Sequence, residues 1–153
     1  MKKGVFLSLL GVLAVMSLAI VGCGDGDDET TASLTRAEFV SQANAVCVRG
    51  TKERSAKFRE AAKEAKPGQT FSDADREQVV RDVLIPPYRK VIEDLKKLGA
   101  PEGDEQEVEA IVEAMEEAAD KVEADPGPAV QSTVQFTEAN KLSAEYGLTD
   151  CVV

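Results

Sequence analysis

Apolar residues recur three or four positions apart in four stretches of the chain, and proline-containing breaks separate these stretches. The stretches cover about residues 35–65, 72–98, 104–124 and 128–146. This spacing is typical of amphipathic α-helices, and no stretch shows the strict alternation of a half-buried strand. Because the connections are short, consecutive helices are expected to be antiparallel neighbours. The pattern predicts an all-α fold, an up-down four-helix bundle over residues 34–153.

Three residues inside the predicted helices depart from a simple apolar stripe. Gly50 costs about 1 kcal/mol in a helix interior, and Arg54 falls on the apolar face of the first helix. We favour an Arg54 side chain whose stem packs while its charge reaches solvent; a contact with a ligand or partner is the alternative. Asn140 lies in the weak stripe of the last helix. A hydrogen bond that fixes helix register is its favoured role, and a ligand or partner contact is the alternative.

Two further signals concern the ends and the continuity of the helices. Pro86-Pro87 interrupt the second stretch without changing its phase, which predicts a kink at residues 85–87 between two segments that share one apolar face. Gly147 followed by Leu148 predicts that the last helix ends with a left-handed glycine and a hydrophobic contact just beyond it.

The N-terminus has the features of an export signal. Lys2 and Lys3 precede an uncharged run from Gly4 to Val21, and a basic region followed by an apolar one describes a secretory signal. The run is also long enough to be considered as a membrane-spanning helix. Small and polar residues within it, and its end at Gly22-Cys23, argue against that alternative.

The four residues Ile20-Val21-Gly22-Cys23 resemble the lipobox of bacterial lipoproteins. The resemblance implies that residues 1–22 are a lipoprotein signal peptide and that Cys23 carries the lipid, including acyl chains such as palmitate. The protein would then be anchored in the cell membrane at its extracytoplasmic face. Residues 23–33 are acidic and polar, and this composition predicts a flexible tether. A calcium loop is the alternative, and it is disfavoured because the carboxylates lack the spacing of such a loop. An ordinary secretory signal and a retained membrane helix are the alternatives.

The chain has three cysteines, and lipidation of Cys23 leaves Cys47 and Cys151. An exported chain meets an oxidising compartment, where two remaining thiols tend to pair. In an up-down bundle the end of the last helix lies near the first turns of the first helix, which carry Cys47. We therefore expect a structural disulfide between Cys47 and Cys151.

The two ends of the predicted bundle also resemble a group of small exported actinobacterial proteins of unassigned function. Leu34-Thr-Arg-Ala-Glu-Phe39 with Ala43-Asn44-x-x-Cys47 is similar to their start, and Tyr146-Gly-Leu148 with Cys151 is similar to their ending. This resemblance implies export and a paired cysteine, and it implies no activity.

The composition excludes several classes of function. The chain has no histidine and no tryptophan, and its net charge is −10. The lack of histidine removes the usual general base, the commonest metal ligand and every Ser-His or Cys-His pair. An acidic chain without a basic, aromatic-rich patch is not expected to bind nucleic acid. We therefore expect no cofactor, no bound metal and no independent enzyme.

The charges are unevenly distributed. Bases are concentrated between Arg49 and Lys66, whereas Lys121 is the single base between Leu98 and Asn140. This separation could orient the domain on an anionic surface, although ordinary solvation of two helices explains it too. The function that we expect is a non-catalytic module that binds an envelope protein or a small ligand. The alternative is an accessory subunit of an envelope enzyme or transporter.

Overall fold

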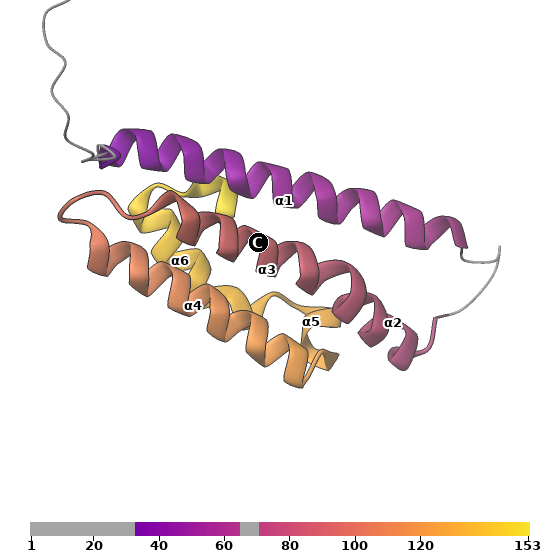
Figure 1. The fold of residues 1–153 in the computed structure, drawn as a ribbon. Coiled ribbons are helices and arrows are strands. Elements are labelled where there is room, and N and C mark those ends of the chain that lie inside the picture. Colours follow the sequence, from indigo (N-terminus) through magenta and orange to yellow (C-terminus); the bar gives the residue numbers. More distant parts are fainter. Residues whose placement is uncertain (1–32, 65–70) are drawn as a thin grey trace, which may run out of the picture. The chain divides into compact units, whose positions relative to one another are not determined.

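The computed structural model of the chain describes residues 33–64 and 71–153, and residues 32–153 cluster as one compact unit. In the described residues every regular element is a helix, which confirms the all-α class (Figure 1). The elements are α1 (Arg36–Glu64), α2 (Asp73–Val79), the π-helix η1 (Val80–Leu84), α3 (Ile85–Leu98), α4 (Glu105–Ala124), α5 (Gly127–Gln131), the 3-10 helix η2 (Val134–Phe136), α6 (Thr137–Tyr146) and the 3-10 helix η3 (Thr149–Cys151). The predicted signal peptide, Cys23 and the tether up to residue 32 lie outside the described residues.

Capping side chains determine where α1 and α2 begin. The Thr35 backbone N–H donates to the Glu38 carboxylate at 2.9 Å, and the Glu38 N–H donates to the Thr35 hydroxyl at 3.3 Å. Ser72 and Asp75 form the same reciprocal pair at the start of α2. Such a pair satisfies backbone donors that have no partner within the helix. In both pairs the hydrogen bonds from the hydroxyl and the backbone lower the pKa of the carboxyl group.

The predicted break in the second helical stretch occurs one turn earlier than residues 85–87. It is the π-helical turn η1, in which the Ile85 N–H donates to the Val80 carbonyl five residues back. Pro86 and Pro87 follow in the first turn of α3, where a helix needs no N–H donor. The prolines therefore follow the wider turn at helix positions that tolerate a residue without an N–H group. The stripe that the spacing predicts through the break is found only in part: Leu84 and Leu98 are half-buried, and the buried residues are Val80, Val83, Ile85, Pro87, Tyr88, Val91, Ile92 and Leu95.

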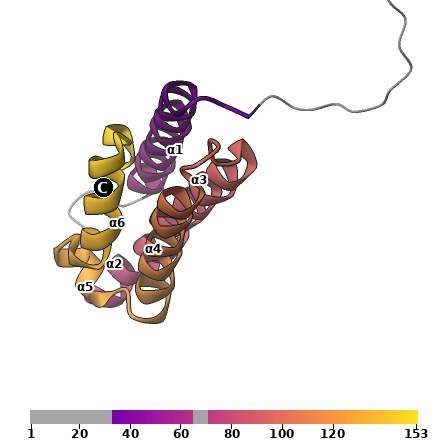
Figure 2. The same ribbon diagram turned by 90° about the vertical axis from the view of Figure 1, so that its left-hand side faces the viewer.

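The core lies between α1, α3, α4 and α6, which surround it in the end-on view (Figure 2). α3 lies between α1 and α4, and α6 packs against α4. The stripe predicted for the third helix is confirmed, since each of its residues is buried in α4: Val108, Ile111, Val112, Met115, Ala118, Ala119 and Val122.

Gly50 marks the closest approach of α1 and α3. A Cβ atom at this position would collide with Cγ2 of Val91 on α3. The residue that weakens α1 as an isolated helix therefore allows the two helices to pack.

The C-terminal half of α1 differs from the prediction. Phe58 lies four positions after Arg54, so the helical spacing predicts it on the same apolar face of the first helix, but it is 58 % exposed. The core-facing residues Phe39, Ala43, Val46 and Cys47 all lie in the first half of α1. Beyond Arg54 the facing element is the first half of the second helical stretch, with Val79, Val80, Val83 and Leu84, and a groove separates it from α1. Phe58 keeps the helical phase but has no core residue to cover it.

The predicted continuous helix over residues 128–146 is also wrong. The chain forms α5, leaves the helical conformation at Ser132 (φ −156°, ψ 166°), and resumes with η2 and α6. The break lets Phe136 become fully buried and pack edge-to-face on Tyr88, with ring centroids 5.2 Å apart. The break is favoured because an edge-to-face pair of buried rings is stabilising. The helical conformation that is lost at Ser132 and Thr133 is worth little, because Ser and Thr are weak helix formers.

The C-terminal cap and the disulfide confirm their predictions. Gly147 has φ 105°, and the Leu148 N–H donates to the Ser143 carbonyl at 2.7 Å, which closes α6. Leu148 is buried. η3 then places Cys151 beside α1, where it is bonded to Cys47 with the two Cα atoms 5.0 Å apart.

Candidate functional site

Two asparagines hold the C-terminal residues against the helices. The Asn44 side chain donates to the Gly147 carbonyl at 3.1 Å and accepts from the Asp150 N–H at 3.0 Å. Asn140 donates to the Val153 carbonyl at 3.1 Å and accepts from the Val153 N–H at 2.9 Å. Both polar groups of Asn140 are thus used within the chain. In the sequence, Asn44 stands out only as part of a resemblance. The structure shows its role: it is half-buried and binds the backbone on both sides of Leu148 and Thr149.

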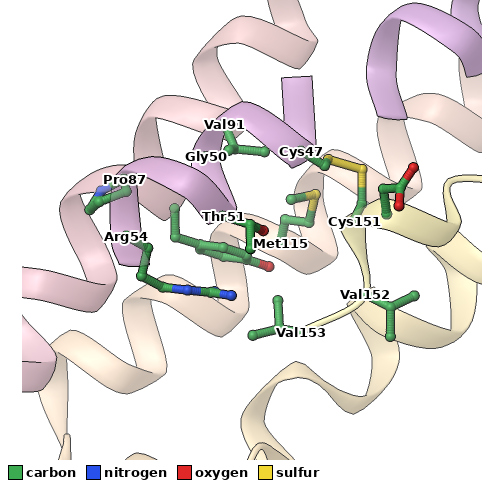
Figure 3. A pocket seen from close by; sticks show the side chains of 12 residues that line it. Cys47, Gly50, Thr51, Arg54, Pro87, Val91, Met115, Cys151, Val152 and Val153 are labelled. Carbon is green, nitrogen blue, oxygen red and sulfur yellow. A yellow bond between two sulfur atoms is a disulfide. The ribbon is translucent and has the colours of Figure 1, made fainter. Parts of the chain in front are cut away.

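A small pocket lies beside the disulfide, between α1, α3 and the C-terminal residues (Figure 3). Cys47, Gly50, Arg54 and Val153 are among its lining residues, and its volume is about 20 Å³. This volume is enough for about one water molecule. The pocket is therefore too small to hold an organic ligand.

Arg54 lies at the edge of this pocket and is half-buried. Its positive charge acts on the neighbouring Tyr88 hydroxyl, whose pKa is raised by burial and lowered to a smaller extent by Arg54. Arg54 also lines the groove that follows this pocket along α1. The side chain therefore reaches two adjacent hollows, and only the groove has room for a ligand.

A second polar cluster joins the ends of α1, α4 and α6. The Tyr146 hydroxyl donates to the Asp104 carboxylate at 2.7 Å, and the Arg36 guanidinium lies 4.2 Å from the centre of the Tyr146 ring. Arg36 also pairs with Asp104 at 3.4 Å and with Glu107 at 3.3 Å. Burial and then the bond to Asp104 raise the pKa of Tyr146. These groups satisfy one another, so the cluster is a tie between helices.

The groove between the C-terminal half of α1 and the α2–η1 segment is the candidate functional site. Its volume is about 440 Å³, which lies within the usual range of ligand pockets. The α2–η1 side is lined by Val79, Val80, Val83 and Leu84, and the α1 side by Arg54, Ser55, Phe58 and Arg59. An apolar surface beside two guanidinium groups suits an apolar molecule or chain segment that carries a negative group.

The chemistry of the groove favours binding. Its lining contains one hydroxyl, that of Ser55, and no carboxylate that could serve as a general base.

Across residues 33–64 and 71–153, no group of three or more cysteine or acidic side chains is placed to hold a metal ion. No helix in these residues combines the length and the apolar character needed to cross a membrane.

The fold and the groove define an all-helical, disulfide-linked module with an open apolar recess. The chain matches no protein-family model, and searches of curated proteins and of solved structures find no similar protein. A function for this module therefore has to be argued from its own residues.

Proposed function

We propose that the protein is a lipid-anchored, extracytoplasmic lipoprotein whose helical module binds a partner protein or a small ligand without catalysing a reaction. The groove beside Phe58 is the observation that carries this proposal. Phe58 is 58 % exposed and faces the apolar side chains of the α2–η1 segment across the groove; a contiguous apolar surface of this kind is typical of a ligand-binding groove.

The anchor is inferred from the resemblance of residues 20–23 to a lipobox, with Cys23 as the lipidated residue. The Cys47–Cys151 disulfide supports export, because such bonds persist in oxidising compartments and are rare in the cytosol. Acyl chains contribute about 0.8 kcal/mol per buried methylene, so two or more chains give a stable anchor. The signal peptide would comprise residues 1–22, and residues 23–33 would tether the module to the cell membrane.

The up-down four-helix description is part of the same proposal. In it, α1 and α4 are single helices, α2, η1 and α3 together make the second helix, and α5, η2 and α6 make the fourth. The contacts of α3 with α1 and α4, and of α6 with α4, support this grouping. The two composite helices are those that carry the π-helical turn and the break at Ser132.

A photoreactive phenylalanine analogue at position 58 tests the binding function in intact cells. We expect a discrete adduct at position 58, because the side chain borders the groove, and little adduct at position 134, where Val134 is 65 % exposed but lies outside the groove. The measurement is the mass and yield of the adduct after disruption of the cells.

The Arg54→Gln variant is the specific control for this experiment, with Lys141→Gln as the matched loss of charge elsewhere. A several-fold lower adduct yield with Arg54→Gln alone is the expected result. Equal yields at positions 58 and 134, or no adduct at either, would contradict the groove as a binding site. An adduct with an envelope enzyme or transporter would favour the alternative function, an accessory subunit.

A further inference from the structure

The basic residues of α1 differ from the other bases in the described part of the chain. Elsewhere, Arg36, Arg76, Arg89, Lys90, Lys96, Lys97, Lys121 and Lys141 all form ion pairs, and Arg81 donates to the Glu123 carbonyl. The bases between Arg49 and Lys63 form no ion pair with any described residue. Among residues 33–64 and 71–153, the positive charge that has no partner in the described part of the chain is therefore concentrated on one helix.

Four of these bases lie on one side of α1. Arg49, Lys52, Arg59 and Lys63 are exposed and follow one another three, seven and four positions apart, so they share one helix face with Ala56 between them. We call these four bases the α1 basic stripe. It extends for about 21 Å at 1.5 Å per residue. Glu53 and Glu60 lie at the edge of this face.

The stripe lies beside the groove and does not enter it except through Arg59. The other groove residues of α1 are Arg54, Ser55 and Phe58, and their positions in the helical repeat place them away from Lys52 and Lys63. A ligand in the groove would therefore leave most of the stripe open. The stripe needs a separate explanation.

We propose that the α1 basic stripe is a docking surface for an anionic phospholipid bilayer. This proposal rests on the proposed lipid anchor, because an anchor keeps the domain close to the membrane surface. As a flexible chain, the ten residue steps from Cys23 to Ser33 would span about 18 Å, whereas α1 with 29 residues is about 44 Å long. Because the proposed tether is shorter than α1, it would hold the start of α1 close to the membrane surface, and α1 could then lie along the bilayer.

The uneven charge of the domain determines which of its faces would turn towards an anionic membrane. The chain as a whole is acidic, with a net charge of −10, so an anionic surface repels most of the domain and attracts the stripe. Each basic residue close to such a surface increases the binding constant roughly fivefold. An acidic partner protein is the other anionic surface that would fit, but an anchored domain meets the bilayer continuously.

A single tryptophan introduced at position 56 would report this docking, because the chain contains no tryptophan and Ala56 is exposed within the stripe. The full chain with Ala56→Trp is used in the form that cells produce: reconstituted if it is membrane-bound, or added to vesicles if it is soluble. The vesicles contain phosphatidylcholine, with or without one third phosphatidylglycerol, and a dansyl-labelled lipid as the energy-transfer acceptor. The anchor is assessed separately, by the intact mass of the protein, so the two proposals can fail independently.

We expect strong energy transfer from the introduced tryptophan on phosphatidylglycerol vesicles at low salt and a fall towards the phosphatidylcholine level at about 0.5 M salt, where screening shortens the reach of charge. Lys52→Gln/Arg59→Gln should lower the ratio of docked to undocked chain about 25-fold. Lys121→Gln/Lys141→Gln, an equal loss of charge at two exposed positions, should leave the ratio unchanged. Equal transfer on both vesicles, an equal effect of both variants, or crosslinking from position 56 to a protein in intact cells would overturn the proposal.

Discussion

Loss of the Cys47–Cys151 disulfide is expected to lower the free energy of unfolding by about 2–5 kcal/mol. The bond joins residues 104 positions apart, and a loop of this length restricts the unfolded chain strongly. The chain-entropy model gives about 4.7 kcal/mol for a loop of 100 residues. Domains of this size have a total stability of about 5–15 kcal/mol, so the bond would supply a large share.

Denaturant unfolding of the oxidised chain, the reduced chain and the Cys47→Ala/Cys151→Ala variant measures this effect. The reduced chain is the matched control, because it keeps both buried side chains and lacks only the bond. We expect both reduced chain and variant to unfold at lower denaturant concentration, with the variant slightly less stable because two buried sulfur atoms are removed. Equal midpoints for oxidised and reduced chains would mean that helix packing alone holds the C-terminal residues in place.

Gly50→Ala is expected to destabilise the protein, although alanine is the better helix former by about 1 kcal/mol. The new methyl group would collide with Cγ2 of Val91, and overpacking of this kind costs about 1–3 kcal/mol. Both residues lie in the contact between α1 and α3, and Val91 is buried, so the methyl group can be accommodated only if Val91 changes rotamer within the core or the helices move apart. The measurement is the free energy of unfolding of Gly50→Ala against the unmodified chain.

The Val91→Ala background isolates the cause. Val91→Ala removes the atom that collides, so Gly50→Ala in that background should stabilise the protein by up to about 1 kcal/mol, as helix propensity alone predicts. The effect of Gly50→Ala thus changes sign between the two backgrounds. If it were the same in both, the close approach of α1 and α3 would not be the reason for the glycine.

The parts of the fold that depend on neighbouring residues could be predicted from the sequence. The apolar stripe of α4, the Thr35–Glu38 cap and the Gly147 cap each need only residues within a few positions of one another. The break at Ser132 could not be predicted, because the contact between Phe136 and Tyr88 that favours it joins residues far apart in sequence. The π-helical turn is a similar case, since the prolines predict a break but not its position.

The groove could not be predicted because periodicity does not show how much of a helix is covered. Phe58 follows Arg54 in the apolar phase of α1, and the pattern treats it like the core residues before it. Its exposure depends on the space that separates α1 from the α2–η1 segment. Gly50 is comparable: the sequence shows its cost to the helix, and only the packing against Val91 shows its benefit.

The intact mass of the protein extracted from cell membranes tests the central claim, a lipid-anchored and disulfide-linked extracytoplasmic module, most directly. The predicted mass is that of residues 23–153 with a diacylglyceryl group on Cys23, with or without a further acyl chain, and with two hydrogens fewer for the Cys47–Cys151 bond. The Cys23→Ser chain should lack the lipid mass and should either keep its N-terminal residues or leave the membrane. A native chain that begins at Met1, carries no lipid, or reacts with alkylating reagent at Cys47 and Cys151 would contradict the account.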